Sequence, residues 1–235
     1  MQVPNEYPSG LRREIIAFLS QFVTPRRLDI LTEALANRTR YITVALEDIY
    51  QSQNASAVLR TCECYGIQDV HIIENTNRFD VNPRVVKGAS QWLTLHKYKS
   101  GANNSLAAIE CLRAQGYRIV ATSPHAAHEL DSFDIRRGRF ALFFGTELQG
   151  LTRTVMDNAD EFIRIPTVGL TESLNLSVTA AICIHTLLMR LRAQELPIGL
   201  SVEESEKLMH LWLRLSIRSW KSLEKRFLST TQALG

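Results

Sequence analysis

The sequence predicts an α/β fold in which a mostly parallel sheet carries helices on both faces. A β-prone run beginning at Tyr41, a helix and a second β-prone run at Val70 form a βαβ unit, which implies parallel strands with a right-handed crossover. Phe140 to Phe144 is a continuous apolar run, as expected of a strand buried on both faces. A further β-prone run ends at Pro166 and leads through a polar loop into a long apolar-periodic helix.

The length and composition favour one core domain with helical appendages. With 235 residues and 45% hydrophobic content, the chain can bury one good core, or one core with helical extensions. We expect an N-terminal helical extension over residues 1–40, a central α/β domain over 41–195 and a C-terminal helical extension over 196–235. The extensions contain apolar-periodic segments at residues 11–22, 27–36 and 201–228, and Ser201 with Glu204 forms a plausible capping box.

The cysteines and hydropathy indicate a cytoplasmic protein that is not embedded in a membrane. Cys62, Cys64, Cys111 and Cys183 form no C-x-x-C pair and no zinc-type spacing, so we expect reduced thiols. The N-terminus lacks a signal-peptide core, and no apolar run approaches the ~20 residues needed to cross a bilayer. The H-x-x-H-E run that starts at His125 is expected to be a polar loop, and no metal is predicted.

The net charge is only +3, but the two ends of the chain are more basic than its middle. Residues 1–40 carry six basic and four acidic side chains, and residues 207–235 carry six basic and one acidic. On a single helix over 201–228, Lys207 and four later cations would share one face. This layout indicates terminal helices that bind a polyanion, although simply solvated faces are the alternative. The candidate residues for binding this polyanion are Arg12, Arg13, Arg26, Arg27, Arg214, Arg218, Lys221 and Lys225.

Polar residues gather at three places where ligands could bind. Ser173 and Asn175 precede the long helix, and a helix start attracts anions, although ordinary capping also explains them. Asn54 and Arg60 lie on a helix that is otherwise small or apolar between them, where the arginine needs either a bound anion or a structural carboxylate partner. Residues 145–151 form a glycine-flanked turn after a buried strand, the usual position of ligands in parallel sheets.

Taken together, three motifs closely resemble those of the SpoU/TrmH branch of the SPOUT methyltransferases. They are Asn54-Ala-Ser-Ala-Val-Leu-Arg60, Phe144-Gly-Thr-Glu147-Leu-Gln-Gly150 and Ser173-Leu-Asn175-Leu-Ser177. The resemblance covers about residues 41–193 and implies a deep C-terminal trefoil knot, a homodimer and S-adenosylmethionine as cofactor. It also implies methylation of a ribose 2'-hydroxyl in RNA. Because the terminal helices look like the extensions of the tRNA-specific members of the family, the expected substrate is a D-loop guanosine of tRNA.

The same resemblance implies which residues form the site. Cofactor contacts, largely through backbone, fall on Thr122, Gly145, Ile165, Leu170 and Leu174. The catalytic neighbourhood falls on Asn54, Arg60, Glu147, Ser173 and Asn175. The family arginine is usually drawn as a base, but a guanidinium is almost never neutral at pH 7, so stabilisation of developing negative charge is the better expectation for it. A ribosomal RNA 2'-O-methyltransferase and a catalytically silent RNA-binding protein are the alternatives.

Overall fold

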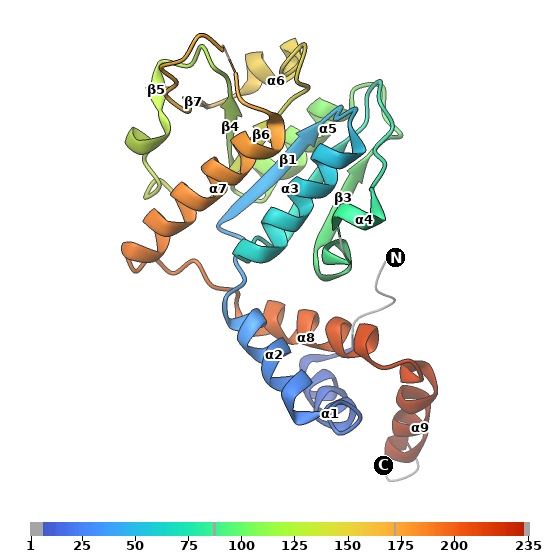
Figure 1. Cartoon of the computed structure of the whole chain (residues 1–235). Helices are drawn as coiled ribbons and strands as arrows, with labels where there is room; N and C mark the ends of the chain where they lie inside the picture. The colour runs from blue at the N-terminus through green and yellow to red at the C-terminus, as the bar shows by residue number, and fades with distance from the viewer. Residues whose placement is uncertain (1–6, 87, 172, 233–235) are drawn as a thin grey trace. The chain divides into compact units, whose positions relative to one another are not determined.

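The computed structural model describes residues 7–86, 88–171 and 173–232, and the chain divides into two compact units (Figure 1). Residues 39–198 form an α/β domain. The described residues on either side, 7–38 and 199–232, belong together to a second, helical unit. The two segments that flank the α/β domain in sequence are therefore parts of one folded unit.

The α/β domain is built on one sheet in which all the paired strands run parallel, as the sequence predicts. The spatial order of the strands is β3-β2-β1-β6-β4-β7-β5. Their bounds are β1 Ile42–Glu47, β2 Asp69–Ile73, β3 Thr94–Tyr98, β4 Arg118–Thr122, β5 His128–Glu129, β6 Phe140–Phe144 and β7 Glu161–Arg164. Because β6 lies between β1 and β4 and is wholly buried, its five-residue apolar run has neighbours on every side.

Helices cover both faces of this sheet (Figure 1). On one face, α3 and α7 pack against each other and contribute to the larger apolar core. On the other, α5 and α6 cover a smaller core that includes Phe143 and Leu112. The elements are α3 Ser52–Tyr65, α4 Pro83–Val86, η1 Ala89–Trp92, α5 Asn104–Ala114, η2 Leu130–Ser132, α6 Arg153–Asn158 and α7 Leu176–Ala193. This arrangement confirms the predicted α/β class with a parallel sheet and helices on both faces.

Three local details differ from the sequence prediction. The sequence pattern predicts a short helix around Val85 to Ala89, but α4 ends at Val86, and η1 begins after Gly88, whose φ of 78° is left-handed. The same pattern predicts Trp92 in a strand, but this residue lies in η1. In the segment expected as a polar loop after β4, His128 and Glu129 form the short strand β5 beside β7. All three differences depend on pairing or turn geometry that periodicity does not encode.

The helix α7 is more apolar than we predicted from the sequence. Over its 18 residues the mean hydropathy is 1.3, so by length and composition alone it could cross a membrane, contrary to the expectation that no apolar run would be long enough. Its buried residues, which include Ala180, Ile184 and Leu188, instead belong to the core of the α/β domain. The apolarity of α7 is that of a core helix.

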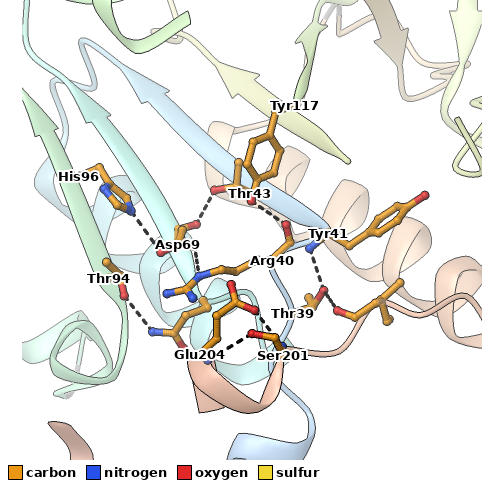
Figure 2. Close-up of polar contacts among 12 residues, drawn as sticks. Thr39, Arg40, Tyr41, Thr43, Asp69, Thr94, His96, Tyr117, Ser201 and Glu204 are labelled. Carbon is orange, nitrogen blue, oxygen red and sulfur yellow. Dashed lines mark hydrogen bonds and ion pairs between the residues drawn. The ribbon is translucent and has the colours of Figure 1, made fainter. Parts of the chain in front are cut away.

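A polar cluster ties the amino-terminal ends of the strands together (Figure 2). Asp69 accepts hydrogen bonds from Arg40 Nε at 2.6 Å and His96 Nε2 at 3.1 Å, and its carbonyl accepts one from Thr43 at 2.7 Å. Burial raises the pKa of Asp69, but the hydrogen bond from His96 and the charge of Arg40 outweigh it and lower the pKa overall. The cluster therefore joins three adjacent strands at the edge opposite their carboxyl ends.

The helical unit contains α1 Ser9–Ser20, α2 Pro25–Ala36, α8 Val202–Ser216 and α9 Trp220–Gln232. Its first two helices agree with the predicted segments, and α8 begins with the predicted capping box of Ser201 and Glu204 (Figure 2). α8 contacts α1, α2 and α9, and Trp212 on α8 is almost completely buried. The unit thus has an apolar core of its own.

The prediction of one continuous helix over 201–228 is wrong. Ile217, with φ −112° and ψ 113°, is extended and ends α8, and α9 begins at Trp220. The predicted row of five cations on one helix face therefore does not exist, and Arg218 lies between the helices. Arg214 is buried and donates to both carboxylate oxygens of Glu224, at 2.7 and 2.8 Å.

Candidate functional site

A pocket of about 390 Å³ lies at the carboxyl ends of β4, β6 and β7. Three segments distant in sequence supply most of its wall, because the carboxyl ends of neighbouring parallel strands meet at one edge of the sheet. These segments are residues 122–125, residues 144–151 and a third that runs from Ile163 into the start of α7. The described wall is mixed in character and includes many backbone groups, so it suits a ligand with polar and apolar parts.

The turn after β6 requires a glycine at its first position. A Cβ on Gly145 would lie 2.2 Å from the backbone of Gly150, so no side chain fits there. Thr146 and Gly150 exchange backbone hydrogen bonds of 3.1 and 3.0 Å, which close the turn upon itself. The backbone of this turn can therefore come close to a ligand in the pocket.

A buried carboxylate holds the far end of this turn. Glu47, at the end of β1, is 1% exposed and accepts hydrogen bonds from the backbone N–H of Thr152 at 2.8 Å and from its hydroxyl at 2.7 Å. It also accepts a hydrogen bond from Ser105 on α5. The turn leaves β6 beside β1 and returns to β1 through Thr152, so Glu47 fixes the loop that forms one wall of the pocket.

Three of the predicted catalytic residues form one hydrogen-bonded network beside the pocket. Asn54 donates to Glu147 of the turn, and Asn175 donates to Asn54 Oδ1 at 3.2 Å. Asn175 also caps α7, because its Oδ1 accepts from the Ser177 N–H at 2.8 Å. The network links α3, the turn after β6 and the start of α7, which are far apart in sequence. Asn175 is thus both the N-cap of α7 and a member of this network.

Arg60 is exposed on α3, six residues after Asn54. Among the described residues, no carboxylate forms an ion pair with it and no side chain accepts its hydrogen bonds. The sequence left open a structural carboxylate partner for Arg60, and none is found among the described residues. A guanidinium without a partner among these residues is available for an external anion such as phosphate.

The structure brings most of the other predicted site residues together. Thr122, Gly145, Ile165 and Leu174 line the pocket, as do Glu147 and Ser173. The side chain of Leu170 is fully exposed and does not line the pocket. Asn54, Arg60 and Asn175 do not line it either, although the two asparagines are joined to it through Glu147.

Sequence reasoning missed two residues, Glu47 and Thr152, whose contact links positions 105 apart in sequence. It also gave no role to Cys183, which lies in the pocket wall. Burial raises the pKa of the Cys183 thiol to about 12, so the thiol stays protonated and contributes an apolar surface. Within the described residues, no group of three or more His, Cys, Asp or Glu side chains is arranged to hold a metal ion.

The predicted RNA-binding cations fall into two groups. Arg12 is buried and donates to the Tyr7 carbonyl, Arg13 pairs with Glu206, Arg27 donates to Ser216, and Arg214 pairs with Glu224. The others are exposed, and no carboxylate of the described residues pairs with them: Arg26, Arg218, Lys221 and Lys225. The second group can bind phosphate without breaking a native ion pair.

Known proteins resemble the chain at the level of sequence. A family model described as the SpoU rRNA Methylase family matches residues 41–185. A tRNA (guanosine(18)-2'-O)-methyltransferase of Borreliella burgdorferi is 42% identical over 210 residues, which cover 89% of this chain and 94% of the relative. A protein of the same name from Thermus thermophilus is 29% identical over 201 residues, covering 81% of this chain and 97% of the relative.

Solved structures resemble the fold. The A. aeolicus TrmH/SpoU tRNA modifying enzyme has a TM-score of 0.72 at 24% identity and covers 82% of this chain and 97% of that one. The SpoU methyltransferase AviRb from Streptomyces viridochromogenes, in complex with the cofactor AdoMet, has a TM-score of 0.58 at 19% identity, covering 68% and 62%. At these identities the likeness concerns the fold alone.

Proposed function

Because the chain belongs to the SpoU methylase family, we propose that it methylates a ribose 2'-hydroxyl in tRNA with S-adenosylmethionine, at a D-loop guanosine. The observation that carries this proposal is the network of Asn54, Glu147 and Asn175 beside the pocket. The names of the relatives, which specify guanosine 18 of tRNA, support the choice of substrate.

The pocket fits the cofactor through its mixed wall. The turn of residues 145–151 and the segments at Thr122 and Ile165 offer backbone donors and acceptors, and Leu174 and Cys183 offer apolar surface. When bound, the cofactor supplies an electrophilic methyl group on a sulfonium. The residues that line the pocket would hold it, while Glu47 keeps the turn in place.

In the proposed mechanism Arg60 stabilises charge and does not act as a base. The 2'-hydroxyl loses its proton as its oxygen attacks, so negative charge develops on that oxygen. A guanidinium cannot accept the proton at pH 7, but it can bind the neighbouring phosphate and the developing alkoxide. Phosphate or water accepts this proton as it leaves the hydroxyl. Asn54 orients the ribose, and Ser173 and Asn175 hold the loop beside it.

We further propose that the chain forms a homodimer with a C-terminal trefoil knot. Arg60 does not line the pocket of its own chain, which supports a site completed by a second copy. The apolar run Phe140 to Phe144 predicts more apolar surface than one small domain covers, but it does not support the dimer, because the chain buries this strand completely. On α7, Val178 and Met189 remain exposed and offer apolar surface for a partner.

The two units would then have different roles, one in catalysis and the other in tRNA binding. Methyl transfer belongs to the domain predicted at 41–195, and tRNA affinity to the terminal segments predicted at 1–40 and 196–235. The exposed cations Arg26, Arg218, Lys221 and Lys225 support this division. A substrate made for translation supports a cytoplasmic location.

A site-mapping experiment tests the proposed function. Purified protein is incubated with radiolabelled S-adenosylmethionine and a tRNA transcript, and the methylated nucleotide is identified by mass spectrometry. We expect one 2'-O-methylguanosine in the D-loop, and no label when that nucleotide is 2'-deoxyguanosine. Methylation of ribosomal RNA with none of tRNA would contradict the choice of substrate. No transfer to either RNA would contradict the enzymatic function.

A further inference from the structure

The helical unit contains a second hollow that the proposed methyl transfer does not use. This groove, of about 440 Å³, is lined by Tyr7, Trp220, Lys221, Glu224, Lys225, Leu228 and Ser229. Trp220 begins α9 and is half-buried, so part of its ring system faces the groove. One wall is therefore aromatic and the rim is cationic.

A buried ion cluster holds the tryptophan in place. The Arg214 guanidinium lies 4.6 Å from the centre of a Trp220 ring and forms two hydrogen bonds to Glu224. His210 also binds Glu224, at 2.6 Å, and its ring contacts the ring of Tyr7. Both aromatic residues of the groove thus rest on one buried cluster. A platform fixed in this way loses little conformational entropy when a planar ligand stacks on it.

The charges around the groove favour an anionic ligand. Lys221 and Lys225 lie one helical turn apart on α9, and both are exposed. Neither ammonium pairs with a carboxylate of the described residues. Among the described residues that line the groove, the one acidic residue is Glu224, which is buried, and its charge is already balanced by Arg214.

We propose that this groove binds an unpaired nucleotide of the RNA substrate, with the base stacked on Trp220 and adjacent phosphates on Lys221 and Lys225. Aromatic side chains next to cations are the usual means of binding unpaired nucleotides, because every base has a π-face and every nucleotide a phosphate. A duplex has its bases already stacked and cannot insert one. The inference rests on the proposed function for the identity of the RNA.

Binding measurements with two kinds of probe test this proposal. The probes are a single-stranded RNA of eight nucleotides and a duplex of the same length, measured alongside the tRNA transcript. We expect Trp220→Leu to weaken binding of the single strand and of tRNA on the order of 10-fold and to leave duplex binding unchanged. Trp220→Phe keeps a stacking surface and should retain most of the affinity. Phe22→Leu, at an exposed aromatic residue of the same unit outside the groove, is the matched control.

A fluorescence measurement keeps the test independent of variant folding. The single strand should quench the tryptophan emission of the native protein, and this quenching should be lost in Trp220→Phe. Absence of quenching in the native protein, or an unchanged affinity in a folded Trp220→Leu variant, would overturn the proposal. Equal losses on single strand and duplex would also overturn it. Displacement of the RNA by a polyglutamate peptide that binds the native protein more tightly would point to an acidic protein partner and would likewise overturn it.

The methylation assay separates this inference from the proposed function. If a Trp220→Leu variant methylates tRNA and binds single-stranded RNA as tightly as the native protein, the RNA-binding role of the groove is refuted and the proposed methyltransferase function stands. Quenching and stacking without methyl transfer by the native protein refute the proposed enzyme and leave the RNA groove.

Discussion

The α/β domain and the helical unit both combine engaged carboxylates with exposed cations, but the cations differ in position. Beside the pocket, Glu47 and Glu147 are engaged by hydrogen bonds from within the domain, and Arg60 has no carboxylate partner among the described residues. In the helical unit, a buried ion cluster serves as support, and several exposed cations have no described carboxylate partner. An exposed arginine in the domain, Arg60, and several exposed cations on the helical unit are consistent with the proposal that the domain carries the chemical step and the helical unit binds the polyanion.

The largest effect is expected for Arg60→Ala. Loss of the guanidinium removes the stabilisation of the developing alkoxide, which should slow methyl transfer by at least about 100-fold. Cofactor affinity should stay nearly unchanged, since Arg60 does not line the pocket. Isothermal titration of cofactor beside a methylation assay decides this point. A parallel loss of cofactor binding would contradict this prediction, because it would mean that Arg60 contributes to the cofactor site.

A smaller effect is expected for Glu47→Gln. The amide would direct a donor at the Thr152 N–H or hydroxyl, both of which now donate to the carboxylate. The lost charged hydrogen bonds correspond to about 2 kcal/mol, or roughly 30-fold in cofactor affinity if the turn is released. Glu110→Gln, at an exposed position of α5, is the control for the loss of one carboxylate. Unchanged cofactor binding in a folded Glu47→Gln protein would show that the turn of residues 145–151 keeps its conformation without the Glu47 carboxylate.

Neutralising Lys221 and Lys225 together should weaken tRNA binding about 10-fold near 0.1 M salt. The slope of log affinity against log salt should flatten by somewhat under two units, because two phosphate contacts are lost. Arg214→Gln should instead lower the melting temperature with little change in slope, because Arg214 is engaged with Glu224. Filter binding over a salt series measures both. A flattened salt slope in the folded Arg214→Gln variant would contradict this prediction, because it would show that Arg214 contacts an RNA phosphate.

The smallest effect concerns acid stability of the helical unit. Burial raises the pKa of Glu224, but hydrogen bonds from His210 and Arg214 and the arginine charge outweigh it and lower the pKa to about 2. A carboxyl whose pKa is lowered on folding stabilises the protein above its ordinary value of 4.5 and loses that contribution as pH falls toward 2. Acid titration followed by circular dichroism should show the native unit losing stability over this range. Glu224→Gln should lack that component, and an identical acid profile in both proteins would contradict the assignment.

Sequence reasoning succeeded where a pattern is local. The apolar run of β6 and the period of α7 predicted both elements, and strand ends predicted where the pocket lies. Contacts such as Glu47 with Thr152 were missed because neither residue carries a local signal of a partner 105 positions away. The burial of Arg214 was missed because it depends on the break at Ile217, which turns α9 back so that Glu224 meets α8.

The division between chemistry and affinity is tested most directly by single-turnover methylation over a range of tRNA concentrations. We predict that the protein lacking the Lys221 and Lys225 charges reaches the native rate at saturating tRNA but needs more tRNA to do so. Arg60→Ala should fail to reach that rate at any concentration. A reduced saturating rate in the lysine variant, or a native rate in Arg60→Ala, would contradict the account.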